Sequence, residues 1–194
     1  TACGGDCNDN DAFTFPGAAE RDDTTSCMRD GDEDGYGDAN APVGVAVGTD
    51  CNDADAAIFP VDADGDGYSS CDGDCDDANP FVYPGAAENE PEPGLCRKDQ
   101  DGDGYGDSEV VSPIIAGTDC NDTNANISGL DADGDGLSAC DGDCLDTDPN
   151  TFPGAAERES STACMTDADG DGFGDAQPSA VVEAGTDCDD EDPA

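Results

Sequence analysis

Hydrophobic positions are few along this chain and follow no long period. No stretch keeps the helical spacing of apolar residues for three turns, and 26 glycines and 12 prolines interrupt the sequence. Three aliphatic stretches could each form a short strand or, equally, an extended linker: Val43 to Val47, Val110 to Ile115 and Val181 to Glu183. We therefore expect a mostly irregular, loop-rich fold with few short β-strands.

The chain has too little apolar material for an ordinary core. Leu, Ile, Val and Phe number 23 among 194 residues, well below the roughly 20% under which a highly charged chain is usually disordered. Fifty acidic and five basic side chains leave a formal net charge of −45. Nucleic acid and anionic membrane surfaces would repel such a chain, and no apolar run is long enough to insert into a membrane. Either the chain is disordered or cations fold it.

Twelve cysteines reveal a tandem repeat. They fall at 3, 7, 27 and 51, then 71, 75, 96 and 120, then 140, 144, 164 and 188, so the same group of four recurs at a nearly constant interval. The segments PGAAE and GTDC recur in step with them. We divide the chain into residues 1–70, which start in mid-register, residues 71–139, and an incomplete module at residues 140–194. A period of this length is typical of a linear array.

The even number and regular placement of the cysteines predict disulfides and an oxidising, extracellular or cell-surface location. Reduced thiols that bind zinc or an iron–sulfur cluster are the alternative, although no Cys-x2-Cys pair occurs. One spacing between cysteines recurs and predicts five bridges, each clamping the base of an acidic loop; the rival scheme pairs cysteines across the next longer interval, such as Cys27 with Cys51. The five predicted pairs are Cys7–Cys27, Cys51–Cys71, Cys75–Cys96, Cys120–Cys140 and Cys144–Cys164.

Cys3 and Cys188 remain without partners in this scheme. By the repeat register they belong to the two classes that pair with each other. A tail-to-head bond between copies would give an open filament, so the sequence predicts a head-to-tail homopolymer. Alternatively, the chain is an arbitrary fragment of a longer array, and the same register follows trivially.

Five segments fit the pattern DxDxDG, in phase with the cysteines. Aspartates at positions 1, 3 and 5 converge on one point, glycine at position 6 permits a sharp turn, and the carbonyl of position 7 adds an oxygen. Three loops carry a further aspartate at position 9. Such an all-oxygen set suits calcium better than magnesium. The predicted ligands are Asp30, Asp32, Asp34, Tyr36 and Asp38; Asp62, Asp64, Asp66 and Tyr68; Asp99, Asp101, Asp103, Tyr105 and Asp107; Asp131, Asp133, Asp135 and Leu137; and Asp167, Asp169, Asp171, Phe173 and Asp175.

Six copies of the pattern DC-x-D-x-[DN] suggest a second class of metal site, in which the glutamate of PGAAE takes part in each module. The alternative is that these aspartates only cap turns. Acids outside both motifs, such as Asp22, Asp23, Glu90 and Glu92, could alternatively be a solvated surface that keeps the chain soluble. The candidate ligands of the second class are Asp6, Asp9, Asp11 and Glu20; Asp50, Asp53 and Asp55; Asp74, Asp77 and Glu88; Asp119 and Asp122; Asp143, Asp146, Asp148 and Glu157; and Asp187, Asp190 and Asp192.

Two resemblances arise from these motifs. The segment DQDGDGYGD at Asp99 to Asp107 resembles thrombospondin type 3 calcium repeats, which implies calcium and disulfides in place of a hydrophobic core. The segments CDGDC at Cys71 to Cys75 and DCDDANPFVYPGAAE at Asp74 to Glu88 resemble the bacterial metal-binding repeat of the MopE type. The copper association of that family does not carry over, because it calls for histidine and an oxidised tryptophan and this chain contains neither residue.

The sequence indicates a binding or structural protein and not an enzyme, since without histidine it offers no ordinary triad or general base. We expect an extracellular calcium-binding structural repeat protein that binds multiple ions, stabilised by calcium and disulfides. It could form a subunit of a surface fibre or filament. The alternatives are a stalk segment of a longer secreted adhesin, a calcium buffer at the surface, or a dockerin-like binding module.

Overall fold

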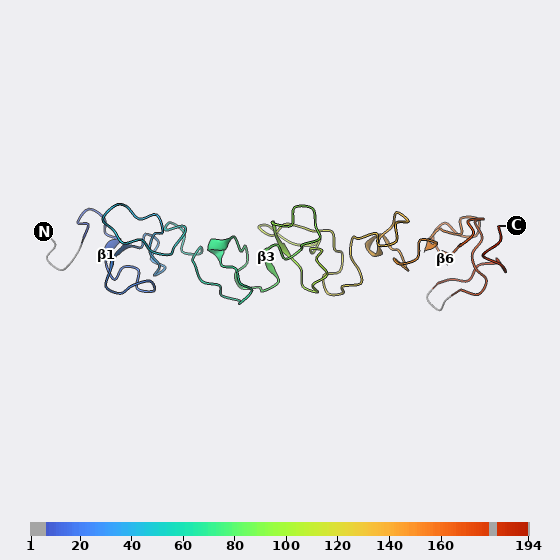
Figure 1. Ribbon diagram of the computed structural model, residues 1–194, viewed down its shortest axis with the longest axis horizontal. Coiled ribbons are helices and arrows are strands. Elements are labelled where there is room, and N and C mark those ends of the chain that lie inside the picture. The colour runs from blue at the N-terminus through green and yellow to red at the C-terminus, as the bar shows by residue number, and fades with distance from the viewer. Residues whose placement is uncertain (1–6, 179–181, 194) are drawn as a thin grey trace. The chain divides into compact units, whose positions relative to one another are not determined.

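Short strands and turns make up the fold (Figure 1). The computed structural model describes residues 7–178 and 182–193, and this part of the chain contains no α-helix. Two 3-10 turns, η1 (Ser70–Asp72) and η2 (Ala139–Asp141), accompany six strands of three residues each. The strands are β1 (Thr14–Pro16), β2 (Cys27–Arg29), β3 (Val82–Pro84), β4 (Cys96–Lys98), β5 (Thr151–Pro153) and β6 (Cys164–Thr166). The expectation of a loop-rich fold with few short strands is confirmed.

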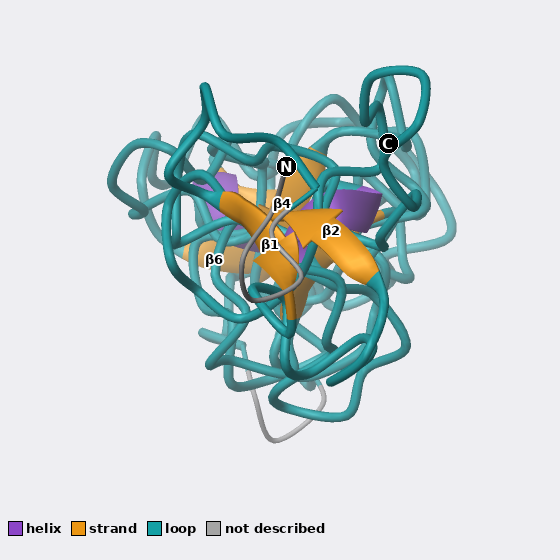
Figure 2. Ribbon diagram, turned by 90° about the vertical axis from the view of Figure 1, so that its left-hand side faces the viewer, coloured by secondary structure: helices purple, strands orange, loops and turns teal. Residues whose placement is uncertain are grey.

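The strands form three small sheets, β1–β2, β3–β4 and β5–β6. Figure 2 shows β1 and β2 among the loops and turns that make up most of the chain. The first and third are antiparallel pairs in the same register, with Phe15 opposite Met28 and Phe152 opposite Met165. After β1 the PGAAE segment turns the chain through Gly17, whose φ of 84° is unfavourable for residues with a side chain. Each sheet is therefore a local hairpin built around one PGAAE segment.

The aliphatic stretches that could have been strands are not strands where the structure describes them. The segment from Val43 turns back on itself, with the Val45 N–H donating to the Pro42 carbonyl, and Val43 is fully exposed. Val111, in the second stretch, is 78% exposed. Strands form instead where a disulfide and the PGAAE turn bring two segments together, which the stretches at 43–47 and 110–115 lack. Val181, in the third stretch, lies outside the described residues.

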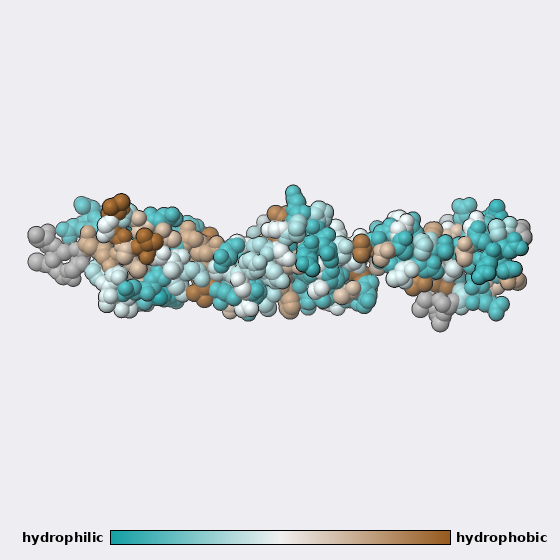
Figure 3. Space-filling view, in the orientation of Figure 1, coloured by the Kyte–Doolittle hydropathy of each residue, from teal (hydrophilic) through white to brown (hydrophobic). Residues whose placement is uncertain are grey.

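Very few apolar side chains are buried. Figure 3 shows a visible face dominated by hydrophilic residues, with hydrophobic ones scattered among them. The buried apolar residues in the described part of the chain are Ala19, Met28, Val82, Ala87, Ala156 and Met165. Three of these are PGAAE alanines, which bury little area. Hydrophobic burial alone is too small to hold this fold, as the composition predicts.

Five disulfides stabilise the loops in the described part of the chain, and they are the five pairs that the recurrent cysteine spacing predicts. Their Cα atoms lie 5.7 to 6.4 Å apart. The rival pairing of Cys27 with Cys51 is therefore wrong. Only two bridges, Cys51–Cys71 and Cys120–Cys140, enclose a DxDxDG loop; the other three enclose hairpins. Cys188 is free and exposed, and Cys3 lies outside the described residues.

The chain forms two compact units. The first comprises residues 1–86, 94–97 and 112–114 and contains the DxDxDG loops that begin at Asp30 and Asp62. The second comprises residues 87–93, 98–111 and 115–194 and contains the other three loops. The three-module division follows the sequence repeat and stays a prediction. No described helix has the length and apolar character needed to cross a membrane.

Candidate metal centres

All five DxDxDG loops share one hydrogen-bond pattern. In the third loop, Asp99 Oδ2 accepts the Gly104 N–H at 2.9 Å, Asp101 Oδ1 accepts the Asp103 N–H at 3.2 Å, and Asp103 Oδ1 accepts the Tyr105 N–H at 2.8 Å. The bond from the glycine at position 6 to the aspartate at position 1 recurs in every loop. The aspartates at positions 3 and 5 thus use one oxygen to close the turn, which fixes the direction of the other, whereas the aspartate at position 1 uses both oxygens in the last four loops.

That other oxygen is commonly buried with neither a hydrogen-bond partner nor an ion pair. Among the described residues sixteen such carboxylate oxygens occur, and every one belongs to a DxDxDG or a DC-x-D aspartate. They are Oδ1 of Asp30 and Oδ2 of Asp32, Asp34, Asp50, Asp64, Asp66, Asp74, Asp77, Asp101, Asp103, Asp119, Asp133, Asp135, Asp143, Asp169 and Asp187. An unpartnered buried carboxylate oxygen is strongly unfavourable unless a cation lies nearby. The loops are therefore built to meet positive charge.

The DC-x-D aspartates lie against the DxDxDG loop that precedes them. The second aspartate of the motif accepts the N–H of loop position 2: Asp53 accepts from Gly31 at 2.6 Å and Asp122 from Gln100 at 2.9 Å. The remaining three loops have the same bond, accepted by Asp77, Asp146 and Asp190. Loop and turn thus form one composite centre, and five such centres result.

Electrostatics show that the first DC aspartate faces the loop carboxylates. Asp119 is fully buried, and this burial raises its pKa to about 6, with further repulsion from Asp103, Asp101 and Asp122. Burial is also the largest cause of the raised pKa of Asp50, Asp74 and Asp143, and repulsion from neighbouring loop carboxylates adds to it. Like charges held this close in a desolvated site disfavour ionisation unless a counter-ion is bound.

This arrangement differs from the grouping that the sequence suggested. The DC aspartates bond the DxDxDG loops, whereas the PGAAE glutamates Glu20, Glu88 and Glu157 are all exposed. The third acid of the DC motif caps a turn: Asp11 accepts the Thr14 hydroxyl, Asp148 the Thr151 hydroxyl and Asp55 the Ala57 N–H. The reason is geometric, because the short turn directs its first two aspartates back towards the loop. Asp9 and Asp192 are exposed, and Asp6 lies outside the described residues.

The residue at loop position 7 contributes through its backbone. Its N–H donates to the aspartate at position 5 in all five loops, although the side chain is Tyr, Leu or Phe. The rings have separate contacts: Tyr36 stacks with Phe59, and Tyr68 with Tyr83. The predicted ligand at this position is a carbonyl oxygen, and the variety of side chains is compatible with that role.

The centres are of two kinds. We call three of them wide centres, because the turn aspartate bonds a loop residue 22 positions away; their loops carry an aspartate at position 9. We call two of them compact centres, because that separation is 14. The wide centres are 30–38 with Asp50 and Asp53, 99–107 with Asp119 and Asp122, and 167–175 with Asp187 and Asp190. The compact centres are 62–68 with Asp74 and Asp77, and 131–137 with Asp143 and Asp146.

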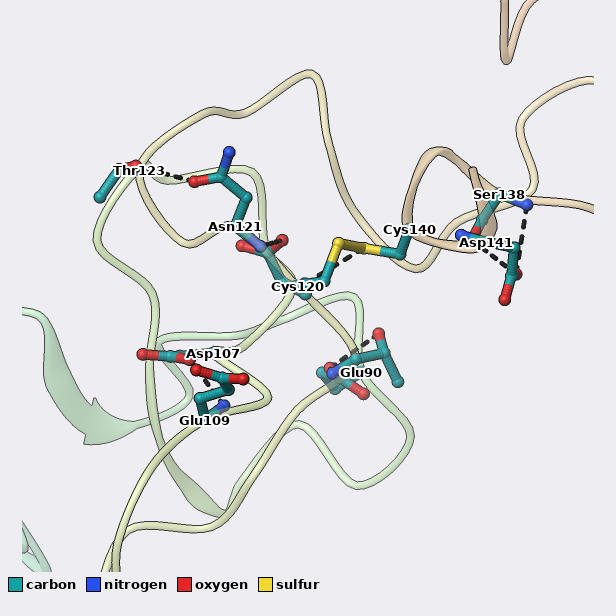
Figure 4. Close-up of a disulfide and its surroundings, with 11 residues drawn as sticks. Glu90, Asp107, Glu109, Cys120, Asn121, Thr123, Ser138, Cys140 and Asp141 are labelled. Carbon is teal, nitrogen blue, oxygen red and sulfur yellow. Dashed lines mark hydrogen bonds between the residues drawn. A yellow bond between two sulfur atoms is a disulfide. The ribbon is translucent and has the colours of Figure 1, made fainter. Parts of the chain in front are cut away.

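Each wide centre has a carboxylate clamp that sequence reasoning missed. Glu90, which is labelled in Figure 4, is buried. It accepts hydrogen bonds from the N–H groups of Gly106 and Thr118 and from the Thr118 hydroxyl. Asp22 and Glu159 make the same bonds in the other two wide centres. An acid two residues after each PGAAE was the available signal. The clamp ties the loop to the GTDC segment that supplies the turn aspartates.

Basic side chains enter two of the wide centres. Arg29 pairs with Asp53 and, through Nε at 3.3 Å, with Asp11. Lys98 pairs with Asp122 and, at 2.9 Å, with Asp107. Although burial opposes the change, the Glu109 N–H and the Lys98 ammonium together lower the pKa of Asp107. Sequence reasoning gave these basic residues no role.

The donor set fits a hard divalent cation. Carboxylate oxygens of Asp30, Asp32 and Asp34 lie within 4.8 Å of one another. The same is true of the three equivalent aspartates in the second loop and in the third, which are Asp62, Asp64 and Asp66, and Asp99, Asp101 and Asp103. The donors are oxygens alone, because the nearby cysteines are in disulfides. In the first four loops the oxygens that lack partners come from residues two apart, which is the geometry that lets one ion contact several carboxylates, whereas in the fifth loop only Asp169 has such an oxygen.

Comparisons with known proteins agree with this chemistry. The family described as "Putative metal-binding motif" (Cu-binding MopE) matches residues 6–25, 50–65, 74–107, 119–132 and 143–163. No curated protein and no solved structure matches the chain. The thrombospondin type 3 resemblance rests on the loop motif alone. Because the matched segments cover more than half of the sequence, the chain belongs to the MopE-type family of metal-binding repeats.

Proposed function

We propose that this protein is an extracellular, calcium-binding structural repeat in which bound ions replace the hydrophobic core. The observation that carries the proposal is the set of sixteen buried, unpartnered carboxylate oxygens, all from the aspartates of the five centres. Calcium accepts six to eight oxygen ligands in flexible geometry, whereas magnesium keeps several waters and rarely takes an all-protein cage. Several carboxylates and a carbonyl per centre favour calcium.

Charge supports the same conclusion. The net charge of −45 opposes any compact state. One divalent ion at each centre would add roughly ten positive charges at the points of strongest repulsion, so ion binding and folding share one free energy. The remaining negative charge keeps the loaded protein soluble.

The disulfides support a location outside the cytoplasm. Five bridges in one chain are typical of secreted or surface proteins, where the environment keeps them oxidised. Calcium is also available there at the concentrations that weaker extracellular sites need.

Small-angle scattering of the oxidised protein tests the main proposal. We expect a compact particle in calcium and an expanded one in EDTA, with limited proteolysis accelerated in EDTA. Equal radii in the two conditions would refute the idea that metal replaces the core. A parallel titration with magnesium separates the metals, because comparable compaction at equal concentrations would contradict calcium selectivity.

A second candidate function is that of a filament subunit. Cys188 is free and exposed, although its register mates Cys51 and Cys120 are both bridged. A partner cysteine on another copy would complete the pattern and join copies head to tail. A stalk segment, a calcium buffer and a dockerin-like module are the other uses of the same array.

Intact mass and sizing with and without reductant distinguish these possibilities. A filament subunit should form disulfide-linked multimers in calcium that reductant dissolves and Cys188→Ser prevents. A calcium-loaded sample that stays monomeric at high concentration favours the stalk or buffer.

A further inference from the structure

One residue position differs systematically among the three wide centres. It is the last residue of the second hairpin strand, directly before the DxDxDG loop, and it is Arg29, Lys98 or Thr166. The first two residues place a positive charge inside the centre. Thr166 instead shares a hydrogen bond of 2.8 Å with the Thr151 hydroxyl and brings no charge.

Both cations contact the same pair of carboxylates. Lys98 Nζ pairs with Oδ2 of Asp107, at loop position 9, and with Oδ2 of Asp122, the second turn aspartate. Arg29 makes the equivalent contacts, with Asp38 at 3.9 Å and with Asp53. The Asp122 and Asp53 side chains are only 5% exposed, so these pairs are little screened by solvent.

Each of these ion pairs occupies a carboxylate oxygen that could otherwise bind a metal ion in the centre. Asp77, the corresponding aspartate of a compact centre, keeps a buried Oδ2 without a hydrogen-bond partner. In the third wide centre Asp175 and Asp190 accept only the N–H groups of Gln177 and Ala168 among the contacts that the structure gives. Arg158 lies over the Phe173 ring of that loop, 5.5 Å from its centroid, and it pairs with neither carboxylate. Lys98 compensates one unit of negative charge at this pair of carboxylates in the third loop, and no ion pair does so at Asp175 and Asp190.

We propose that Arg29 and Lys98 are tethered counter-ions, so that the residue before each wide loop sets how strongly the centre binds calcium and how ordered it is without calcium. This inference rests on the proposed calcium function. A tethered ammonium or guanidinium repels an incoming divalent ion and occupies a ligand oxygen, which weakens binding. It also neutralises part of the cluster in the ion-free chain, which preserves the loop. The centre at Thr166 should bind most strongly and lose order first on chelation.

The sequence allows one loop to be observed at a time. It contains four tyrosines and no tryptophan, and Tyr105 lies within the third loop. In a background of Tyr36→Phe, Tyr68→Phe and Tyr83→Phe, terbium luminescence excited through Tyr105 reports that loop alone. Adding Phe173→Tyr and Tyr105→Phe moves the reporter to the fifth loop. Displacement of terbium by calcium then gives the calcium affinity of each loop.

The decisive variants exchange the residue before the third loop, Lys98, and the residue before the fifth loop, Thr166. Lys98→Thr should raise the calcium affinity of the third loop about tenfold, and Thr166→Lys should lower that of the fifth by about the same factor. In EDTA, hydrogen exchange of residues 99–107 should become faster in Lys98→Thr. Lys98→Arg keeps the charge, as Arg29 does at the equivalent position of the first wide centre, and should leave the affinity within about twofold.

Val111→Asp controls for the net charge of Lys98→Thr, because it also makes the chain more negative by one unit but does so on an exposed side chain. It should alter the calcium affinity of neither loop by more than about twofold. If Lys98→Thr and Thr166→Lys both leave calcium affinity unchanged, or shift it in the opposite directions, the inference is overturned. If the parent reporters bind neither terbium nor calcium, the proposed function falls as well. Because Thr166→Lys adds a charge that the two other wide centres already contain, it tests the idea even if Lys98→Thr fails to fold.

Discussion

The compact centre at Asp62 and the wide centre at Asp99 share a loop motif but are held together differently. The compact loop lies inside the Cys51–Cys71 bridge and is closed by a 3-10 turn. In its counterpart at Asp131, the Ser138 hydroxyl bonds Asp141 at 2.8 Å (Figure 4). The wide loop lies between bridges.

Two noncovalent contacts close the wide centre. One is a parallel β-bridge between the backbones of Asp107 and Asp119, and the other is the Glu90 clamp. The first aspartate of the loop is buried in the wide centre and exposed in the compact one, since Asp99 is 8% exposed whereas Asp62 is exposed. A covalent clamp thus permits an open, local site. A noncovalent clamp accompanies a deeper site assembled from distant segments.

Removing the covalent clamp should have the largest effect. Cys51→Ser with Cys71→Ser should destabilise the first unit by about 3 kcal/mol, the value expected for a bridge that closes a loop of about 20 residues. Hydrogen exchange in calcium should show the loss concentrated at residues 62–77. The same pair of substitutions at Cys7 and Cys27 is the control, since that bridge encloses a hairpin; equal opening of 62–77 in both would contradict a local clamp.

Breaking the noncovalent clamp should affect only a wide centre. Glu90→Ala leaves two N–H groups and a hydroxyl without their acceptor, which should cost about 2 kcal/mol of stability. The measurement is thermal unfolding in calcium, with terbium luminescence through Tyr105 as the local readout. Glu88→Ala, at an exposed glutamate nearby in sequence, should be neutral. A neutral Glu90→Ala would mean that the parallel bridge suffices.

Acid should weaken calcium binding at the wide centre that contains Asp119. In the ion-free fold the pKa of Asp119 is raised from 3.8 to about 6, so protonation favours this fold as pH falls through 6, and it competes with calcium. Calcium affinity of the third loop should therefore drop about tenfold between pH 7 and pH 5. Calcium titrations of the Tyr105 reporter at both pH values check this. Asp119→Asn should bind weakly at both, and an unchanged pH dependence in that variant would exclude Asp119 as its source.

The smallest effect concerns loop position 4. Glu33 has a φ of 64°, whereas the other four loops have glycine with a positive φ at this position. Glu33→Gly should relieve that strain and stabilise the first loop by about 1 kcal/mol, as measured by thermal unfolding in calcium. Gly102→Glu is the reverse change in the third loop and should destabilise it by a similar amount. Destabilisation by Glu33→Gly would indicate that the Glu33 side chain has a contact of its own.

Much of the architecture could be predicted from the spacing of cysteines and aspartates alone. The recurrent interval between cysteines predicted all five bridges, because a repeated module must pair equivalent residues in the same way. The same holds for the DxDxDG loops, whose hydrogen bonds join residues two to five positions apart. Strands were not accessible in this way, because three-residue hairpins such as β1–β2 leave no periodic pattern.

The sequence by itself determined the local units: the loops, the turns, the cysteine pairs and a charge that only cations can compensate. Each depends on contacts between residues that are close together along the chain, so its pattern is visible in the letters. Tertiary structure alone decided which units share an ion. It placed Asp119 and Asp122 on the loop at Asp99, assigned Glu90 to the clamp and brought Lys98 inside the centre. These pairings depend on the path of the chain between motifs, and like-charged carboxylates have no sequence pattern that names their partners.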